Sequence, residues 1–260
     1  MKKRKEEAVI KSHEEISPGI FSLWIETEFA TYAKSGQFLG VYLNDKTKLL
    51  ARPISICDVE PSKKLLRMVY RVSGEGTKEL SKYTAGTKIN VLGVLGNGYD
   101  SAVKESLGGK KVILMGGGIG IPPMLLATKS LDCQKEVVLG YSVSDLFLHD
   151  EFEREAKVYV ATVDGSVGTK GTVIDALREN KIEGDVIFAC GPMPMLKAIK
   201  QYASEHNMKA YISLEERMAC GVGACLGCVC RTVNKDHHTN VNNTRICVEG
   251  PVFDSEEVDI

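Results

Sequence analysis

The sequence lacks any run of about 18 consecutive apolar residues, so it predicts no transmembrane helix. No apolar stretch follows the basic residues 1–5, and we therefore expect a short solvated end and no signal peptide. The net charge of −1 leaves no excess of positive charge for binding nucleic acid. The sequence also has no internal repeat and no low-complexity segment. These absences favour a cytoplasmic chain that binds neither membranes nor nucleic acid.

Cysteine is frequent and unevenly distributed, because five of the eight cysteines lie between Glu215 and Phe253. Three of them form C-x4-C-x2-C, and a fourth follows after the 18 residues 229–246. This is the ligand spacing of a plant-type 2Fe–2S cluster. The predicted ligands are Cys220, Cys225, Cys228 and Cys247. Three glycines between the first three cysteines allow the loop to curl around a cluster.

Zinc, disulfide bonds and a Rieske centre fit these cysteines less well. Structural zinc sites usually use two C-x2–4-C pairs, whereas here the grouping is three plus one. A disulfide framework needs an oxidising compartment. A Rieske centre would use two histidines, and His237 and His238 lie in the 229–246 insert, but four cysteines already suffice. Cys230 follows Cys228 by two residues in an extended segment, and we interpret it as a packed thiol outside the cluster.

The first part of the chain predicts an antiparallel β-barrel. Short apolar and β-branched runs alternate there with Gly, Pro, Asn and Asp. The predicted strands are 20–26, 37–43, 48–59, 65–73 and 88–96.

From residue 110 the pattern changes to alternating strands and helices, and the fully apolar strands indicate a parallel sheet covered on both faces. The predicted strands are 110–116, 137–142, 158–163, 185–191 and 209–215, and the predicted helices begin near residues 122, 143, 172 and 193. A chain of 260 residues suffices for two domains and a small module. We expect a barrel over 1–101, an α/β nucleotide-binding domain over 102–213 and a cluster module over 214–260.

Two groups of residues in the barrel are suited to a phosphate-containing ligand. Arg52 begins an Arg-Pro-Ile-Ser sequence, and its guanidinium offers a planar set of donors. Gly76 and Thr77 precede a helical stretch over 78–82, where an anion could bind. An edge-strand Arg-Pro and an ordinary capped turn would account for the same residues without a ligand.

Two turns of the α/β domain are candidates for binding a nicotinamide nucleotide. Four glycines in residues 116–120 follow an apolar strand, and Pro122 suits a first helical turn. The standard G-x-G-x-x-G fingerprint is absent, because Ile121 stands where the third glycine would be. A Cys-Gly-Pro turn begins at Cys190, at the end of another strand, where α/β sheets bind ligands. A small buried thiol would also account for Cys190.

Taken together, RPIS, GEGT, GGGIGIPPM, CGPMPML and ERMACGVGACLGCVC, followed by ICVEGPVF, resemble the electron-transfer subunits of bacterial NAD-dependent (B-type) dihydroorotate dehydrogenases, within the ferredoxin–NADP reductase superfamily. The resemblance covers essentially the whole chain and preserves the motif order. It implies FAD contacts at Arg52, Pro53, Ile54, Ser55, Val69, Tyr70, Arg71, Gly76 and Thr77. It implies nicotinamide contacts at Gly117, Gly118, Gly120, Pro122, Cys190, Gly191 and Pro192.

The resemblance also implies a partner, an FMN-containing dihydroorotate dehydrogenase subunit, in a two-plus-two heterotetramer. Electrons would pass from FMN through the cluster and FAD to NAD, because only a flavin exchanges both single electrons and hydrides. We expect no catalytic acid or base in this chain. The alternatives are a flavin subunit of NADH-dependent ferredoxin–NADP oxidoreductase or sulfide dehydrogenase and, in another class, a 2Fe–2S redox sensor.

Overall fold

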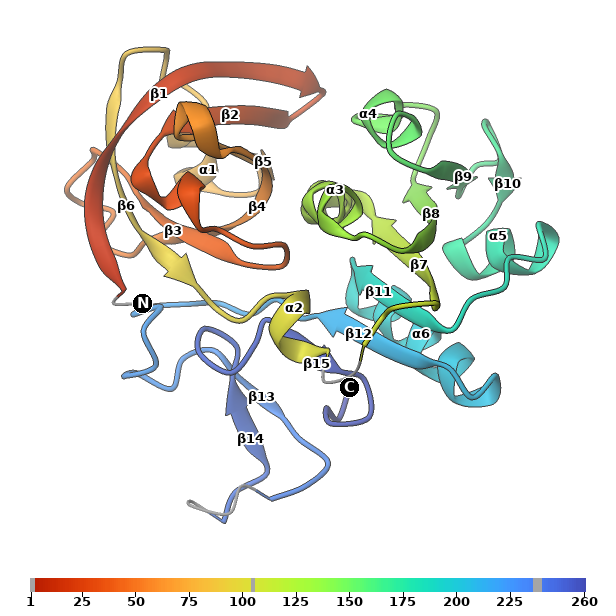
Figure 1. Ribbon diagram of the computed structural model, residues 1–260. Helices are drawn as coiled ribbons and strands as arrows, with labels where there is room; N and C mark the ends of the chain where they lie inside the picture. Colours follow the sequence, from red (N-terminus) through yellow and green to blue (C-terminus); the bar gives the residue numbers. More distant parts are fainter. Residues whose placement is uncertain (1–2, 104–105, 236–239) are drawn as a thin grey trace.

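The computed structural model describes residues 3–103, 106–235 and 240–260. A β-barrel and an α/β domain lie side by side, and the C-terminal part of the chain lies below both (Figure 1). This arrangement confirms the predicted fold class. In the described part of the chain, no helix is long and apolar enough to cross a membrane.

The barrel is closed and entirely antiparallel, in the strand order β1-β2-β5-β4-β3-β6. Its strands are β1 (Arg4–Ser17), β2 (Ile20–Glu26), β3 (Phe38–Tyr42), β4 (Arg52–Glu60), β5 (Leu65–Arg71) and β6 (Lys88–Leu95). Short helices connect them: η1 (Glu28–Thr31), η2 (Pro61–Lys63) and α1 (Glu75–Leu80). Alternate residues of β6 are buried: Ile89 and Val91 belong to the barrel core, whereas Leu95 packs toward the C-terminal module.

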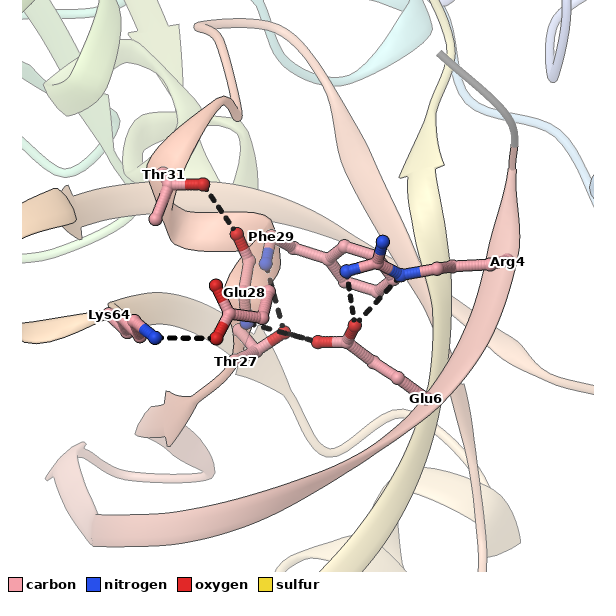
Figure 2. Close-up of polar contacts among 7 residues, drawn as sticks. All are labelled: Arg4, Glu6, Thr27, Glu28, Phe29, Thr31 and Lys64. Atoms are coloured by element: carbon pink, nitrogen blue, oxygen red, sulfur yellow. Dashed lines mark hydrogen bonds and ion pairs between the residues drawn. The ribbon is translucent and has the colours of Figure 1, made fainter.

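The first strand departs from the sequence prediction, because Arg4 and Lys5, which were expected in a solvated end, already belong to β1. Arg4 already pairs with Gly93 of β6. Figure 2 shows how β1 is fastened at this point: Glu6 binds the Arg4 guanidinium and accepts hydrogen bonds from the Thr27 hydroxyl and from the Glu28 backbone N–H. Glu28 in turn pairs with Lys64, at 2.6 Å. The charged residues lie on the outer face of a barrel strand, and for this reason they resemble a solvated tail in the sequence.

The α/β domain contains a seven-stranded sheet in the order β10-β9-β8-β7-β11-β12-β15. Its strands are β7 (Lys111–Gly117), β8 (Gln134–Tyr141), β9 (Lys157–Thr162), β10 (Thr169–Lys170), β11 (Val186–Cys190), β12 (Lys209–Ser213) and β15 (Val252–Asp254). The helices are α2 (Tyr99–Ala102), η3 (Gly118–Gly120), α3 (Ile121–Ser130), α4 (His149–Glu153), α5 (Val173–Glu179) and α6 (Met193–Glu205). All neighbouring strands are parallel except β12 and β15.

Helix α3 joins the two domains. Residues 121–128 are all buried, because one side of the helix packs on the sheet and Leu126 enters the barrel core. Two ion pairs reinforce this interface: Arg67 of β5 binds both oxygens of Glu151, at 2.8 and 2.9 Å, and Lys129 lies 2.5 Å from Asp58 of β4. The barrel is thus held against the α/β domain by apolar packing and by charge.

The C-terminal module contains a two-stranded sheet of β13 (Val229–Arg231) and β14 (Asn243–Arg245). Strand β15 then returns to the α/β sheet, where Phe253 pairs with Ile212 and is 6% exposed. Phe253 therefore packs in the core between the α/β sheet and the C-terminal module, and it holds the module against the sheet. The division at 101/102 and 213/214 stays a prediction, although β15 lies beyond the second boundary and inside the sheet. His237 and His238 lie outside the described residues.

Candidate functional site

The four cysteines with cluster spacing converge as two pairs. The thiol of Cys220 lies close enough to that of Cys225 to affect its pKa, and the same holds for Cys247 and Cys228. Cys228 and Cys247 are buried, whereas Cys225 is exposed at the surface. The four thiols therefore extend from the interior of the module to its surface, and the group faces solvent at Cys225.

The pairing fits two iron atoms better than one zinc ion. In a tetrahedral zinc site with bonds of about 2.3 Å, all four sulfurs lie about 3.8 Å apart. Among residues 3–103, 106–235 and 240–260, no three cysteine sulfurs lie within 4.8 Å of one another. Two thiols for each iron is the arrangement of a 2Fe–2S centre with four cysteine ligands.

In the loop that follows Cys220, backbone N–H groups point toward a cysteine sulfur. Gly221 and Gly223 adopt φ angles of 67° and 88°, which favour glycine. As a result, the N–H groups of Val222 and Ala224 point at Cys220 Sγ, at 3.5 and 3.3 Å. Desolvation alone would raise the pKa of Cys220, but these hydrogen bonds and those from Cys225 outweigh it and lower the pKa to about 6. The site thus favours a thiolate, the form that binds metal.

Cys230 differs from the four candidate ligands in its surroundings. It lies in β13 opposite Thr244, half-buried against the core of the α/β domain. Burial raises the pKa of its thiol to about 11. Its role as a packed thiol stays a prediction.

The proposed FAD residues of the barrel gather at one end of β4 and β5. The Arg52 side chain lies flat against Gly76, where a methyl group would come 2.2 Å from Arg52 Nε. Its Nη1 donates to the carbonyl oxygens of Lys48 and Leu50. The guanidinium is therefore held at the start of α1 by Nη1, and its N–H groups at Nε and Nη2 are suited to donate to a phosphate group.

Helix α1 begins earlier than the sequence predicts. Gly76 and Thr77 do not precede the helix but form part of its first turn, Glu75–Leu80. Thr77 Oγ1 accepts hydrogen bonds from the backbone N–H groups of Ser73 and Gly74, which caps the helix one turn sooner.

Of the three predicted residues of β5, Tyr70 lies on one face of the strand and Val69 and Arg71 on the other. Tyr70 is 3% exposed, and its hydroxyl lies 2.9 Å from His13 Nε2 within the barrel, so only its backbone can meet a flavin. Val69 is buried in the core shared with the α/β domain. Arg71 is exposed and reaches toward Gly118, where a methyl group would lie 3.9 Å from Arg71 Nη2. Arg71 therefore spans the two predicted nucleotide sites.

The two candidate nicotinamide turns lie next to each other. They end the adjacent parallel strands β7 and β11, where the strand order reverses direction and ligands usually bind in such sheets. A methyl group on Gly120 would lie 2.3 Å from the Cys190 carbonyl oxygen. Met195 belongs to the CGPMPML motif but was not predicted to contribute to the site, and its side chain fills the space beside Gly117 and Gly191.

The cluster loop is in contact with the barrel near the strand that carries the Arg-Pro motif. A methyl group on Gly221 would lie 3.2 Å from Leu95 of β6. A small pocket at this contact is lined by Pro53 of β4 and also by Cys220. The predicted FAD strand and the predicted cluster are therefore neighbours in space, although about 165 residues separate them in the chain.

Comparison with known proteins agrees with this architecture. Residues 215–259 match the family model of the iron–sulfur cluster binding domain of dihydroorotate dehydrogenase B. The chain is 42% identical over 255 residues to the electron transfer subunit of dihydroorotate dehydrogenase B (NAD(+)) from Bacillus pumilus, an alignment that covers 96% of each chain. It is 38% identical over 267 residues to the same subunit of Fusobacterium nucleatum, with 98% of each chain covered.

The chain belongs to the family of dihydroorotate dehydrogenase B electron transfer subunits.

Solved structures support the same fold for this member of the family. An NADH-dependent reduced ferredoxin–NADP oxidoreductase superposes with a TM-score of 0.85 at 32% identity, over 97% of this chain and 89% of that chain. A ferredoxin–NADP reductase from Neisseria gonorrhoeae superposes at 0.64 with 17% identity, over 77% of this chain and 91% of that chain, which shows the fold alone. Because identity to the electron transfer subunits is higher, the dihydroorotate dehydrogenase family is the better assignment.

Proposed function

We propose that this chain carries electrons from an FMN-containing dihydroorotate dehydrogenase subunit to NAD, using a 2Fe–2S cluster and FAD that it binds itself. The contact between the Cys220 loop and the Pro53 strand carries this proposal, since it brings the two candidate cofactor sites side by side. When bound, the flavin exchanges single electrons with the cluster and hydride with the nicotinamide.

The residues of the chain have separate tasks in this proposal. Cys220, Cys225, Cys228 and Cys247 hold the cluster, and the backbone N–H groups of their loop stabilise its charge. The Arg52 guanidinium binds the FAD phosphates beside Gly76. The nicotinamide binds beside the backbone turns Gly117–Gly120 and Cys190–Pro192, which follow the adjacent parallel strands β7 and β11.

The partner docks, in this proposal, on the exposed rim of the cluster loop. Val222 and Leu226 are 43% and 62% exposed, and Leu226 has a left-handed φ of 53°, which is uncommon for a leucine. An exposed apolar side chain held in this conformation beside a redox centre suits a protein interface. We further propose a two-plus-two complex in the cytoplasm, where the thiols stay reduced.

The proposed function is tested with the isolated chain and with its partner. The reconstituted chain should oxidise NADH with an artificial electron acceptor and show no activity with dihydroorotate. Adding the FMN-containing partner should create dihydroorotate-dependent reduction of NAD, measured by the absorbance of the NADH that forms. Turnover of dihydroorotate by the isolated chain, or no NAD reduction by the reconstituted complex, would rule the relay out.

Replacing Leu226 by aspartate should weaken partner binding at least tenfold, because a charge would be buried in the interface, at a cost of about 1.4 kcal/mol or more. Aspartate tolerates the left-handed conformation, so the loop itself should keep its shape. Binding is measured by titration calorimetry, and NADH oxidation with an artificial acceptor should stay unchanged. Val163→Asp, at an equally exposed position of the α/β domain, serves as the control. Equal affinity of the Leu226→Asp and wild-type chains would place the docking surface elsewhere.

A further inference from the structure

An arginine and a glutamate form a rigid unit around the fourth cysteine. Arg245 Nη2 and Nε donate to the two carboxylate oxygens of Glu249, at 2.5 and 3.1 Å. The Arg245 backbone N–H donates to the same carboxylate, at 2.9 Å, and the N–H groups of Val248 and Glu249 return to the Arg245 carbonyl. Cys247 lies inside this turn, and the guanidinium is fixed in one orientation.

The remaining Arg245 donor reaches across to the loop of the first three cysteines. Nη1 donates to the carbonyl oxygen of Gly223, at 3.0 Å. Gly223 is pressed against the turn, since a methyl group there would lie 2.5 Å from Val248 Cγ2. This loop is thereby joined to the segment that supplies the fourth cysteine.

The hydrogen bond from Arg245 acts on a peptide group that faces the cluster site. The Gly223 carbonyl and the Ala224 N–H belong to one planar peptide unit and point in opposite directions. The carbonyl accepts from Arg245, and the N–H donates to Cys220 Sγ, at 3.3 Å. Arg245, the peptide and the sulfur therefore form one continuous hydrogen-bonded chain. The Cys220 thiol stands here for the cluster-bound thiolate.

We propose that Arg245 is a positioning residue that raises the reduction potential of the cluster through the Gly223–Ala224 peptide. This inference rests on the proposed function only in requiring that the four cysteines bind a 2Fe–2S cluster. A cation on the carbonyl polarises the peptide and strengthens the N–H···S bond at its other end. Hydrogen bonds to the sulfurs help to set the potential of such clusters, because they stabilise the more negative reduced state. Glu249 holds the guanidinium in place through its two carboxylate oxygens.

The test is a redox titration of the full chain, monitored by electron paramagnetic resonance, after iron and sulfide have been quantified. Arg245→Met should keep the cluster but lower the equilibrium constant for its one-electron reduction about tenfold. This corresponds to a reduction potential lower by about 59 mV. Arg245→Lys, which keeps the charge and one set of donors, should recover part of the loss. The matched control is Arg231→Met, which removes the same charge from the neighbouring strand β13. It should shift the equilibrium constant less than about threefold, since within the described residues the Arg231 guanidinium has no hydrogen bond to a peptide that donates to a sulfur.

Equal shifts in Arg245→Met and Arg231→Met would overturn the proposal, since overall charge would then account for both. A wild-type potential in Arg245→Met would overturn it as well. If Arg245→Met loses iron, Arg245→Gln and Arg245→Lys decide, because both keep a donor: the glutamine variant should titrate lower than the lysine variant, and equal potentials would contradict the role of the cation. A wild-type chain that binds no cluster would refute the proposed function itself, and the iron assay detects that outcome separately.

Discussion

Replacing any one of Cys220, Cys225, Cys228 and Cys247 by serine is expected to abolish or cripple cluster incorporation. The four thiols converge as the pairs Cys220–Cys225 and Cys228–Cys247, so one iron would lose one of its two protein ligands. A hydroxyl remains protonated near neutral pH and is a poor substitute for a thiolate. Iron and acid-labile sulfide analysis of each purified variant measures the loss, together with its visible absorption. Dihydroorotate-dependent NAD reduction by the complex should disappear in parallel.

Cys230→Ser provides the matched control, since it removes a cysteine two residues from a ligand. Cys230 is half-buried against the core and forms part of the β13–β14 ladder. We expect this variant to keep the iron and sulfide content of the wild type. Loss of iron from Cys230→Ser combined with retention in Cys228→Ser would show that the ligand assignment is wrong.

Arg52→Ala is expected to weaken FAD binding by about 1.5–3 kcal/mol, the usual contribution of a hydrogen bond to a charged group. This corresponds to roughly a tenfold to hundredfold increase in the dissociation constant. The Arg52 side chain lies against Gly76 in the first turn of α1, and an alanine offers no side-chain donor at that place. Flavin content after gel filtration, and fluorescence titration with added FAD, measure the effect.

Lys63→Ala is the matched control for this variant. Lys63 is an exposed cation of the same barrel that pairs with its near neighbour Glu60. The control variant should retain flavin like the wild type. The flavin released from the wild-type chain on denaturation should be FAD. Release of FMN, or full occupancy in Arg52→Ala, would contradict the assignment of this site.

Several elements of the fold follow directly from sequence patterns. The fully apolar runs near 110–116 and 185–191 became the central strands β7 and β11, because a strand buried on both faces needs apolar residues at every position. The start of α3 was also predicted closely, since prolines at 122 and 123 suit its first turn. Strand β2 occupies the predicted residues 20–26.

The ends of several elements depend on side-chain contacts that the sequence does not reveal. Strand β4 begins at Arg52 and not at residue 48, because the carbonyl oxygens of Lys48 and Leu50 accept hydrogen bonds from the Arg52 side chain. Helix α4 is shorter than the predicted polar stretch and begins after Leu148, which adopts a left-handed φ of 65°. Strand β1 was missed because its charged residues alternate on a solvated barrel face.

The cofactor chemistry is encoded locally in the amino-acid sequence. The spacing of Cys220, Cys225, Cys228 and Cys247, and the glycines between them, are properties that few metal centres share.

How the separate motifs meet depends instead on the folded chain. Folding brings Pro53 next to Cys220, turns Tyr70 into the barrel, and joins Arg245 to the Gly223 carbonyl. These contacts arise when distant segments pack against one another, and neither spacing nor periodicity along the chain encodes such pairings.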